Sequence, residues 1–381
     1  MLPLPASPTH ICVLRLSALG DICNLVPAVR AMQQQWPNAR ITWIVGRAEH
    51  RLLSGLDGVE LRVYDKSTGL KGMYALWRQL STTHFDVLVH AQQSLRASFL
   101  SLGLKAHVRL GYDAERAKDH QTWFTNRRLA PRPRAHVLTS FLDFARALGV
   151  DEQRLARDQL MWNIPIPNEA YAEAMQITQG AHYMVVSPCA TPRRRNYRNW
   201  TAAGYAAAIN YAYRQHWLVT VLSGGRRDEE QAMVAEIMAL VRRHRESQSD
   251  DGMPIDALGR TSLKGLLALI RRARIVIAPD SGPVHMANAL GTPVLGLFAT
   301  TNPDRAAPYL WRDYVVNRYP DAVAAYGGGR TVDEMTWGAR VRHPNAMQLI
   351  TVDDVTSQLE RLLAATALRD QGDQALFGHD I

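Results

Sequence analysis

One stretch, Ile275–Phe298, constrains the fold of this chain more than any other. The apolar run Ile275–Ala278 is typical of a buried parallel strand, and it leads into Asp280-Ser281-Gly282. We expect a short helix from Pro283 to Leu290 and a second strand at Val294–Phe298. Strand, turn, helix and strand in this order form a βαβ unit, so the chain should contain a parallel sheet.

The turn within this unit is a candidate anion site. Ligands of open α/β sheets bind at the carboxyl ends of the strands, where helix N-termini direct free N–H groups outward. Asp280, Ser281 and Gly282 therefore suit a ligand such as a phosphate. The same residues are equally compatible with an ordinary capped helix that binds nothing.

The alternation of apolar runs and helical segments occurs in both halves of the chain. The expected strands of the first half are Ile11–Leu16, Ile41–Val45, Val59–Tyr64, Phe85–Ala91 and Val108–Gly111, and those of the second half before the opening unit are Tyr183–Ser187, Trp217–Leu222 and Asp256–Gly259. This pattern predicts two α/β domains with doubly wound parallel sheets, at residues 1–165 and 166–350. Residues 351–381 should form a C-terminal helix and a polar tail, whereas Thr301–Arg342 should be irregular. The helix after the first strand should carry Pro27 near its first turn.

Composition and missing motifs exclude several classes of protein. No apolar run reaches the roughly 18–20 residues that span a bilayer. The N-terminus lacks the basic start of a signal peptide, and the three scattered cysteines fit a reducing cytoplasm and offer no metal site. We find no Walker A motif, no HExxH and no GxGxxG after the first strand, which argues against P-loop, zinc and nicotinamide sites.

The net charge of +9 indicates an anionic partner: a phosphorylated substrate, an anionic membrane face or nucleic acid. Only five of the 44 basic residues are lysines, and arginine is the better bidentate partner of phosphate. Part of this charge lies in a long segment, Gly111–Ala135, which combines Arg116, Lys118 and His120 with aromatic residues. Such a segment can hold an anionic acceptor or can be a solvated surface loop, and the residues alone do not separate these alternatives.

Three expected strand ends of the second half carry small or polar residues: Cys189-Ala190-Thr191, Gly224-Gly225 and the opening turn. Arg198 precedes a helix that should begin near Thr201, from where it can reach a diphosphate. Glu229 can accept hydrogen bonds from ribose hydroxyls, or it can be an exposed Glu favoured by the helix dipole.

In the first half, Asp21 ends the first βα loop. A carboxylate there can take a proton from a substrate hydroxyl, but it can also be a helix N-cap. His285 is open to two interpretations as well, because a histidine beside Met286 and Ala287 is usually a packed or surface side chain.

Several segments, in order, resemble the ADP-heptose:lipopolysaccharide heptosyltransferase family of inverting glycosyltransferases, over Ile11–Ala365. Arg15–Asp21 is similar to the family's (R/K)xSxxGD motif, and Asp280–Tyr309 to its DSGxxHxAxAxGxPxxxLFxxTxPxRxxPY signature. The remaining similar segments are Phe85-Asp86-Val87, Pro188 with Ala190 and Arg198-Asn199-Trp200, Gly224-Gly225 with Glu229, and Gly259-Arg260-Thr261-Ser262.

The resemblance implies a GT-B fold, in which two Rossmann-like domains face a cleft and the C-terminal helix packs back on the N-terminal domain. It implies an ADP-sugar donor as substrate, no cofactor and no metal, and a phosphorylated Kdo–lipid A core acceptor at the inner membrane rather than a nucleic acid. By the same resemblance, Asp21 is the general base. The donor-binding residues are Thr191, Arg198, Gly224, Gly225, Glu229, Thr261, Asp280, Ser281, Gly282 and His285, and the acceptor-binding residues are Ser17, Arg116, Lys118 and His120.

The chain departs from the family pattern at three places. Arg198 stands where lysine is more frequent, Pro192–Tyr197 lengthens the loop with arginines, and Phe298 is not followed by the usual glycine. Two further functions remain open at this point: a nucleotide-sugar 2-epimerase, which has the same fold, and a basic nucleotide- or nucleic-acid-binding module.

Overall fold

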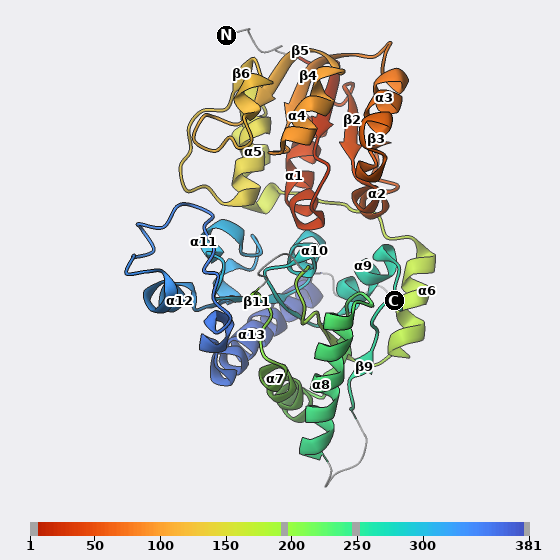
Figure 1. Cartoon of the computed structure of the whole chain (residues 1–381). Helices are drawn as coiled ribbons and strands as arrows, with labels where there is room; N and C mark the ends of the chain where they lie inside the picture. The colour runs from red at the N-terminus through yellow and green to blue at the C-terminus, as the bar shows by residue number, and fades with distance from the viewer. Residues whose placement is uncertain (1–6, 192–196, 246–251, 377–381) are drawn as a thin grey trace. The chain divides into compact units, whose positions relative to one another are not determined.

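The computed structural model describes residues 7–191, 197–245 and 252–376 of the chain, which divides into two compact units, Met1–Pro165 and Ile166–Ile381 (Figure 1). Each unit contains one six-stranded sheet, and every strand pair is parallel. The predicted α/β class with two doubly wound sheets is therefore confirmed. Most of the arginine-rich run at Pro192–Tyr197 and the end of the polar tail lie outside the described residues.

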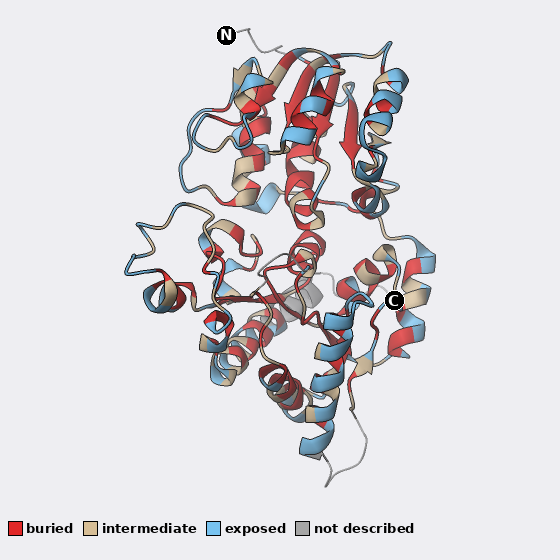
Figure 2. Cartoon of the chain, viewed as in Figure 1, coloured by how far each residue is buried: buried red, intermediate tan, exposed pale blue. Residues whose placement is uncertain are grey.

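The sheet of the first unit has the strand order β3-β2-β1-β4-β5-β6. Its strands are β1 (His10–Leu14), β2 (Arg40–Val45), β3 (Val59–Val63), β4 (His84–His90), β5 (Lys105–Gly111) and β6 (Arg127–Arg128). Its helices are α1 (Leu19–Gln35), α2 (Arg47–Leu53), α3 (Gly69–Gln79), α4 (Leu95–Leu102) and α5 (Val137–Leu148). All five residues of β1 are buried, because this apolar run lies at the centre of the sheet and is covered on both faces (Figure 2).

Helices α3 and α4 cover the same face of this sheet. Met73 and Leu76 of α3 join Ala97 and Leu100 of α4 in one apolar cluster with Leu88 of β4. The indole N–H of Trp77 in α3 also donates to the carbonyl oxygen of Leu100 at 2.8 Å. On another side of the unit, α1 and α5 pack against each other.

Helix α1 begins earlier than the sequence predicts, and Pro27 lies in its interior rather than near its first turn. Proline has no N–H to donate, so the carbonyl oxygen of Cys23, four residues earlier, loses its helical partner. The indole N–H of Trp162 donates to that oxygen at 2.8 Å. A side chain from the end of the unit thus replaces the hydrogen bond that Pro27 removes.

The second unit has the strand order β12-β11-β10-β7-β8-β9. Its strands are β7 (Tyr183–Val186), β8 (Val219–Leu222), β9 (Ile255–Asp256), β10 (Val276–Pro279), β11 (Val294–Phe298) and β12 (Val316–Asn317). Its helices are α6 (Asn168–Thr178), α7 (Ala202–His216), α8 (Asp228–Arg245), α9 (Leu263–Arg272), α10 (Gly282–Leu290), α11 (Pro303–Ala306), α12 (Tyr319–Tyr326) and α13 (Val352–Leu376). The predicted βαβ unit at Ile275–Phe298 is present as β10, α10 and β11.

The segment Thr301–Arg342 is more regular than the sequence predicts, because it contains α11, α12 and the edge strand β12. Strand β12 is only two residues long, which is too short for a periodic sequence pattern. Helix α13 contacts α7, β11 and β12. Its predicted packing on the first unit stays a prediction.

Candidate functional site

The centre of the second sheet provides the setting for a ligand. Strands β7 and β10 are neighbours there, and the strands that follow them in the chain lie on opposite sides. This is the topological switch point, at which the loops after two adjacent strands diverge and leave a crevice. The residues at this point are those after β7, up to Thr191, and Asp280-Ser281 after β10.

Arg198 connects these two loops. Its guanidinium group donates to the carbonyl oxygen of Asp280 at 2.7 Å and to that of Thr191 at 3.0 Å. The residue is 8% exposed, so its charge lies within the protein at the loops' junction. A buried planar guanidinium held by two carbonyl oxygens is a rigid donor group.

Asp280 is surrounded by cationic or titratable side chains. Its carboxylate lies 3.9 Å from the guanidinium of Arg198, 3.7 Å from that of Arg340 and 3.9 Å from the ring nitrogen of His285. Burial by itself raises the pKa of this carboxyl, but the contact with His285 and the charges of Arg198 and Arg340 outweigh burial and lower the pKa to about 2. With Asp280 ionised, the four side chains together carry net positive charge.

The N-terminus of α10 adds an electrostatic contribution of the same sign. Ser281 is its N-cap, yet the buried hydroxyl oxygen of Ser281 makes no hydrogen bond among the described residues. A side chain added at Gly282 would meet only the end of Met286, at 3.7 Å, so the backbone here is open to close approach. A helix N-terminus with a buried hydroxyl lacking a partner, beside two arginines, can bind an anion.

The glycine turn after β8 is shaped by a residue that the sequence interpretation does not single out. The backbone N–H of Gly225 donates to the carboxylate of Glu230 at 3.1 Å, and a Cβ at Gly225 would lie 2.7 Å from that carboxylate. A Cβ at Gly224 would lie 2.8 Å from Leu258. A Cβ at either position would therefore force the end of a neighbouring side chain to move. Glu230 is buried and also pairs with Arg227 at 2.9 Å.

Glu229, the predicted ribose ligand, lies one residue earlier on α8 and is exposed. It accepts a hydrogen bond from the side-chain amide of Asn199 at 3.1 Å, and the amide oxygen of Asn199 in turn accepts from the N–H of Ala190 at 2.8 Å. Asn199 thus links Glu229 to the loop after β7, and the structure brings Glu229, Thr191 and Arg198 together.

Thr261, predicted on the adenine side, follows β9 at the edge of the sheet and is half-buried. Its neighbour Ser262 caps α9, and Ser262 is held by Glu173 of α6 through its hydroxyl at 2.7 Å. Strand β8 lies between β9 and the central pair. Thr261 therefore belongs to the rim of the carboxyl edge rather than to the cluster around Asp280.

The first unit has its own switch point, between β1 and β4. The loop after β1 carries Ser17 and leads to Asp21 in the first turn of α1, and the loop after β4 carries Gln92. The side-chain oxygen of Gln92 accepts from the backbone N–H groups of Leu16 at 3.0 Å and Ser17 at 3.2 Å. Gln92 thereby fixes the loop that leads to Asp21.

Asp21 is not an N-cap, because Ala18 occupies that position. The carboxylate lies in the first turn of α1, where its Oδ2 accepts from the N–H of Ala18 at 3.3 Å and forms an ion pair with Arg15. The side chain of Asp21 is 34% exposed, whereas that of Arg15 is 11% exposed. A buried arginine thus orients a carboxylate that solvent and ligands can still reach, which suits a general base.

The three basic residues predicted to bind the acceptor lie in different environments. Arg116 is largely buried and pairs with Asp113, with Asp143 of α5 at 2.7 Å and with the carbonyl oxygen of Ala130 at 2.9 Å. This geometry indicates that Arg116 holds the loop onto α5. Lys118 and His120 are exposed, and the His120 ring stacks on Trp123 with ring centroids 4.4 Å apart.

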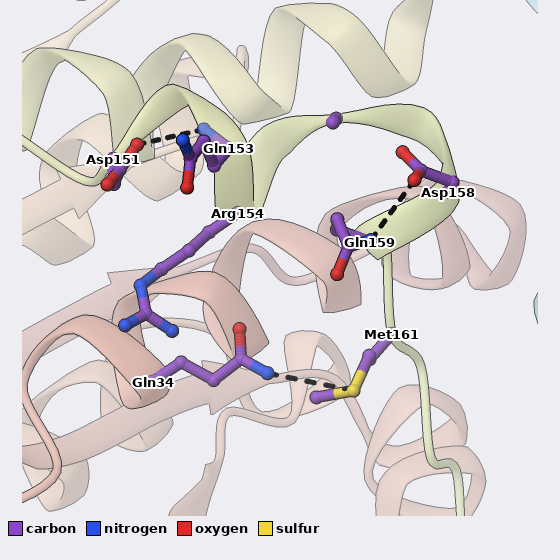
Figure 3. Close-up of a pocket in the computed structure, with 8 residues that line it drawn as sticks. Gln34, Asp151, Gln153, Arg154, Asp158, Gln159 and Met161 are labelled. Carbon is purple, nitrogen blue, oxygen red and sulfur yellow. Dashed lines mark hydrogen bonds between the residues drawn. The ribbon is translucent and has the colours of Figure 1, made fainter.

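A further depression of about 610 Å³ lies on the first unit, lined by residues of α1 and of the segment after α5 (Figure 3). Hydrogen bonds lie within its lining: the side-chain amide of Gln159 donates to Asp158 at 3.1 Å, and the backbone N–H of Gln153 donates to Asp151 at 2.9 Å. Gln34 lies at the end of α1 opposite to Asp21. The depression is therefore separate from the candidate site.

Within the described residues, no group of three or more His, Cys, Asp and Glu side chains is arranged to hold a metal ion. The sequence names Asn199 only as part of a motif, without a role, and does not single out Arg340, Glu230 or Gln92. Glu230 had a local signal as well, since it follows Glu229 directly in the first turn of α8. An antiparallel bridge pairs Arg340 with Thr301, and the side chain of Arg340 lies near Asp280. No local sequence pattern predicts this bridge.

Comparison with known proteins identifies the family of this chain. A family profile described as Glycosyltransferase family 9 (heptosyltransferase) matches residues 73–322. The lipopolysaccharide core heptosyltransferase OpsX of Haemophilus influenzae is 36% identical over 357 residues, which cover 93% of this chain and 97% of that protein. Lipopolysaccharide heptosyltransferase 3 of Escherichia coli is 25% identical, with 91% of this chain and 97% of that protein covered.

Solved structures show the same fold. The glycosyltransferase family 9 protein of Veillonella parvula superimposes with a TM-score of 0.73 at 20% identity, over 94% of this chain and 98% of that one. The E. coli ADP-heptose lipopolysaccharide heptosyltransferase II superimposes with a TM-score of 0.69 at 19% identity, over 94% and 99% of the two chains. The E. coli heptosyltransferase WaaC with ADP superimposes with a TM-score of 0.64 at 18% identity, over 92% and 97% of the two chains.

Proposed function

The chain belongs to glycosyltransferase family 9, the heptosyltransferases, and we propose that it transfers a heptosyl group from ADP-heptose to the inner core of lipopolysaccharide. The acceptor in this proposal is a Kdo–lipid A or heptosyl core precursor. A similar nucleotide sugar is the alternative donor. The names of the H. influenzae and E. coli relatives support the acceptor, and ADP in the WaaC structure supports the nucleotide.

One observation supports this function most directly: the cationic group around Asp280 at the switch point of the second unit. Arg198, Arg340 and the N-terminus of α10 meet there, beside the buried hydroxyl of Ser281. These groups suit the diphosphate of a nucleotide sugar. The carboxylate of Asp280, which its low pKa keeps ionised, lies within 3.9 Å of both arginines, and His285 in the first turn of α10 adds a donor for the sugar or the diphosphate.

In the proposed reaction, an acceptor hydroxyl attacks the anomeric carbon of the donor sugar. A bond forms between the acceptor oxygen and that carbon, the bond between that carbon and the diphosphate oxygen breaks, and the configuration inverts. The proton of the hydroxyl passes to the carboxylate of Asp21, which Arg15 orients. The departing ADP carries the negative charge.

Stabilisation of that charge falls to Arg198 and the N-terminus of α10, with Thr191 close to Arg198. We propose that these groups act without a metal ion and without a cofactor. Gly224 and Gly225 shape the neighbouring turn, Glu229 binds the ribose, and Thr261 lies toward the adenine.

We place the acceptor on the first unit, at the edge that holds Ser17 and Asp21. Lys118 and His120 are exposed and are available to phosphate groups of the core, whereas Arg116 shapes the loop that presents them. A lipid-anchored acceptor implies that the enzyme works in the cytoplasm at the surface of the inner membrane. None of the described helices is long and apolar enough to cross a bilayer.

The test is to incubate the protein with ADP-heptose and a truncated Kdo2–lipid A and to measure ADP release. Release that requires the acceptor, with a heptosylated product, supports the proposal. Turnover of the donor without acceptor would indicate an epimerase instead. If acceptor-dependent release occurs with another nucleotide sugar and not with ADP-heptose, the protein is still a transferase, but its donor differs from the one proposed.

A further inference from the structure

Exposed apolar side chains are concentrated on one side of the first unit. Leu70 and Tyr74 of α3 are 80% and 67% exposed. On α4, Leu95, Phe99 and Leu102 are all exposed, and their spacing places them along one stripe of that helix. These five residues, on helices joined by the Trp77 hydrogen bond, form what we call the α3/α4 face.

The α3/α4 face is continuous with the aromatic loop that follows β5. The rings of Phe99 and Phe124 meet edge to face, with centroids 5.4 Å apart. The next residue toward the N-terminus, Trp123, is 77% exposed. Soluble monomers rarely leave so many large apolar side chains together without a partner.

The charge on α3 and α4 is of one sign. Between residues 66 and 112 the chain contains one acidic residue, Asp86, and this carboxylate accepts from Thr9 at the far end of β4. Lys71, Arg78 and Arg96 are exposed on α3 and α4, and within the described residues none of their side chains forms an ion pair. Three of the chain's five lysines, Lys66, Lys71 and Lys105, lie between residues 66 and 112.

The α3/α4 face also borders the edge of the sheet that holds Asp21. Helix α4 begins at Leu95, directly after the loop of β4 in which Gln92 holds the backbone of Ser17. Ser94 caps the start of α4 by accepting from the N–H of Ala97. A surface that contacts this side of the unit is therefore next to the proposed acceptor edge.

We propose that the α3/α4 face docks on an anionic phospholipid bilayer, with its apolar side chains in the headgroup region and its lysines and arginines on lipid phosphates. Exposed aromatic and aliphatic side chains flanked by cations, without acids between them, match this surface in chemistry and charge. The inference rests on the proposed function, because docking here brings the Asp21 edge to the membrane that carries the acceptor.

The test measures sedimentation of the purified full-length chain with vesicles of phosphatidylcholine alone, or of phosphatidylcholine and phosphatidylglycerol in equal parts. A charge variant combines Lys71→Gln, Arg78→Gln and Arg96→Gln, and an apolar variant combines Tyr74→Ser and Leu102→Ser. The matched controls replace exposed residues elsewhere: Arg154→Gln, Arg214→Gln and Arg243→Gln in one, and Met175→Ser with Trp217→Ser in the other.

We expect the wild type to prefer the anionic vesicles and to lose binding as salt is added. The charge variant should bind the anionic vesicles at least about tenfold more weakly, since each basic residue near such a surface contributes measurably. The apolar variant should also lose binding, whereas both controls should bind as the wild type does. Circular dichroism spectra and thermal midpoints equal to those of the wild type verify that the variants are folded.

Three results would overturn the proposal: no preference of the wild type for anionic vesicles, binding unchanged in both face variants, or a wild-type dimer that the face variants convert to monomer. The last would make the face a contact between two copies of the chain. A second assay separates docking from catalysis: both face variants should retain wild-type transfer to a deacylated, water-soluble core acceptor and lose transfer to an acceptor embedded in anionic vesicles. Failure of the wild type on both acceptors would refute the proposed function and leave the vesicle measurement intact.

Discussion

The substitution Asp280→Asn tests whether the cationic group of the second unit is organised by one carboxylate. Asparagine has the shape of the protonated acid, so it removes the charge that Arg198, Arg340 and His285 surround. The folded protein lowers the pKa of Asp280 from its ordinary 3.8 to about 2. A depressed folded-state pKa stabilises the fold at pH values above the unfolded pKa, here by about 2–3 kcal/mol, at roughly 1.4 kcal/mol per pKa unit.

The pH dependence follows from the same linkage. The contribution of Asp280 should be fully present near neutral pH and should be lost as the pH falls from about 4 to about 2, through the folded-state pKa. The free energy of unfolding of Asp280→Asn should therefore lie about 2–3 kcal/mol below that of the wild type at neutral pH, and the two should converge in acid.

Urea unfolding, followed by fluorescence and by hydrogen exchange in peptides from β10 and α10, measures this difference. Hydrogen exchange is needed because two units can unfold separately, in which case a single transition is not a defined quantity. Asp313→Asn, at an exposed position of the same unit, is the control and should change the free energy by less than about 0.5 kcal/mol. A neutral-pH difference as small as that of the control, or one that persists in acid, would refute the reasoning.

Further predictions concern the reaction. Asp21→Asn should lower kcat by about two orders of magnitude with ADP affinity unchanged in calorimetry; activity close to wild type would exclude Asp21 as the base. Arg198→Ala should weaken ADP binding and turnover together by about 2–4 kcal/mol, and Arg198→Lys should recover only part, because an ammonium cannot reach both carbonyl oxygens. Arg340→Ala should weaken ADP binding less than Arg198→Ala, since its side chain is 32% exposed; an equal loss would contradict that ranking. Glu230→Gln should lower the thermal midpoint, and a midpoint equal to wild type would show that the glycine turn holds without this charge.

Much of the fold follows from the sequence because parallel strands buried on both faces appear as continuous apolar runs. The runs at Ile41–Val45 and Val294–Phe298 match β2 and β11 to within a residue. The edge strands β6 and β12 are two residues long and carry no such signal, so they are not predicted. The start of α1 is predicted too late because Pro27 is expected near a helix start. The hydrogen bond that allows Pro27 inside the helix comes from Trp162, which is far away in the sequence.

The prediction of a glycosyltransferase of the heptosyltransferase family is confirmed, since its motifs are local and occur in order. The roles of single residues depend instead on neighbours that the motifs do not contain. Glu229 and Glu230 are adjacent in sequence, but the turn of α8 directs Glu229 to Asn199 and Glu230 into the glycine turn. The sequence presents Arg116 as a basic residue available to a ligand, whereas the structure shows that it pairs with Asp113 and Asp143.

By itself, the sequence determines that the chain forms two parallel-sheet units with small polar residues at the strand ends, because apolar runs and turn residues act over a few positions. Only the tertiary structure places Arg198 across the junction of two loops and brings Arg340 to Asp280, since these contacts join residues up to 82 positions apart. It also shows that large apolar side chains of α3 and α4 are exposed: Leu70, Tyr74, Leu95, Phe99 and Leu102. Helical periodicity predicts that such residues share a stripe, but whether that stripe is covered depends on what else packs against it.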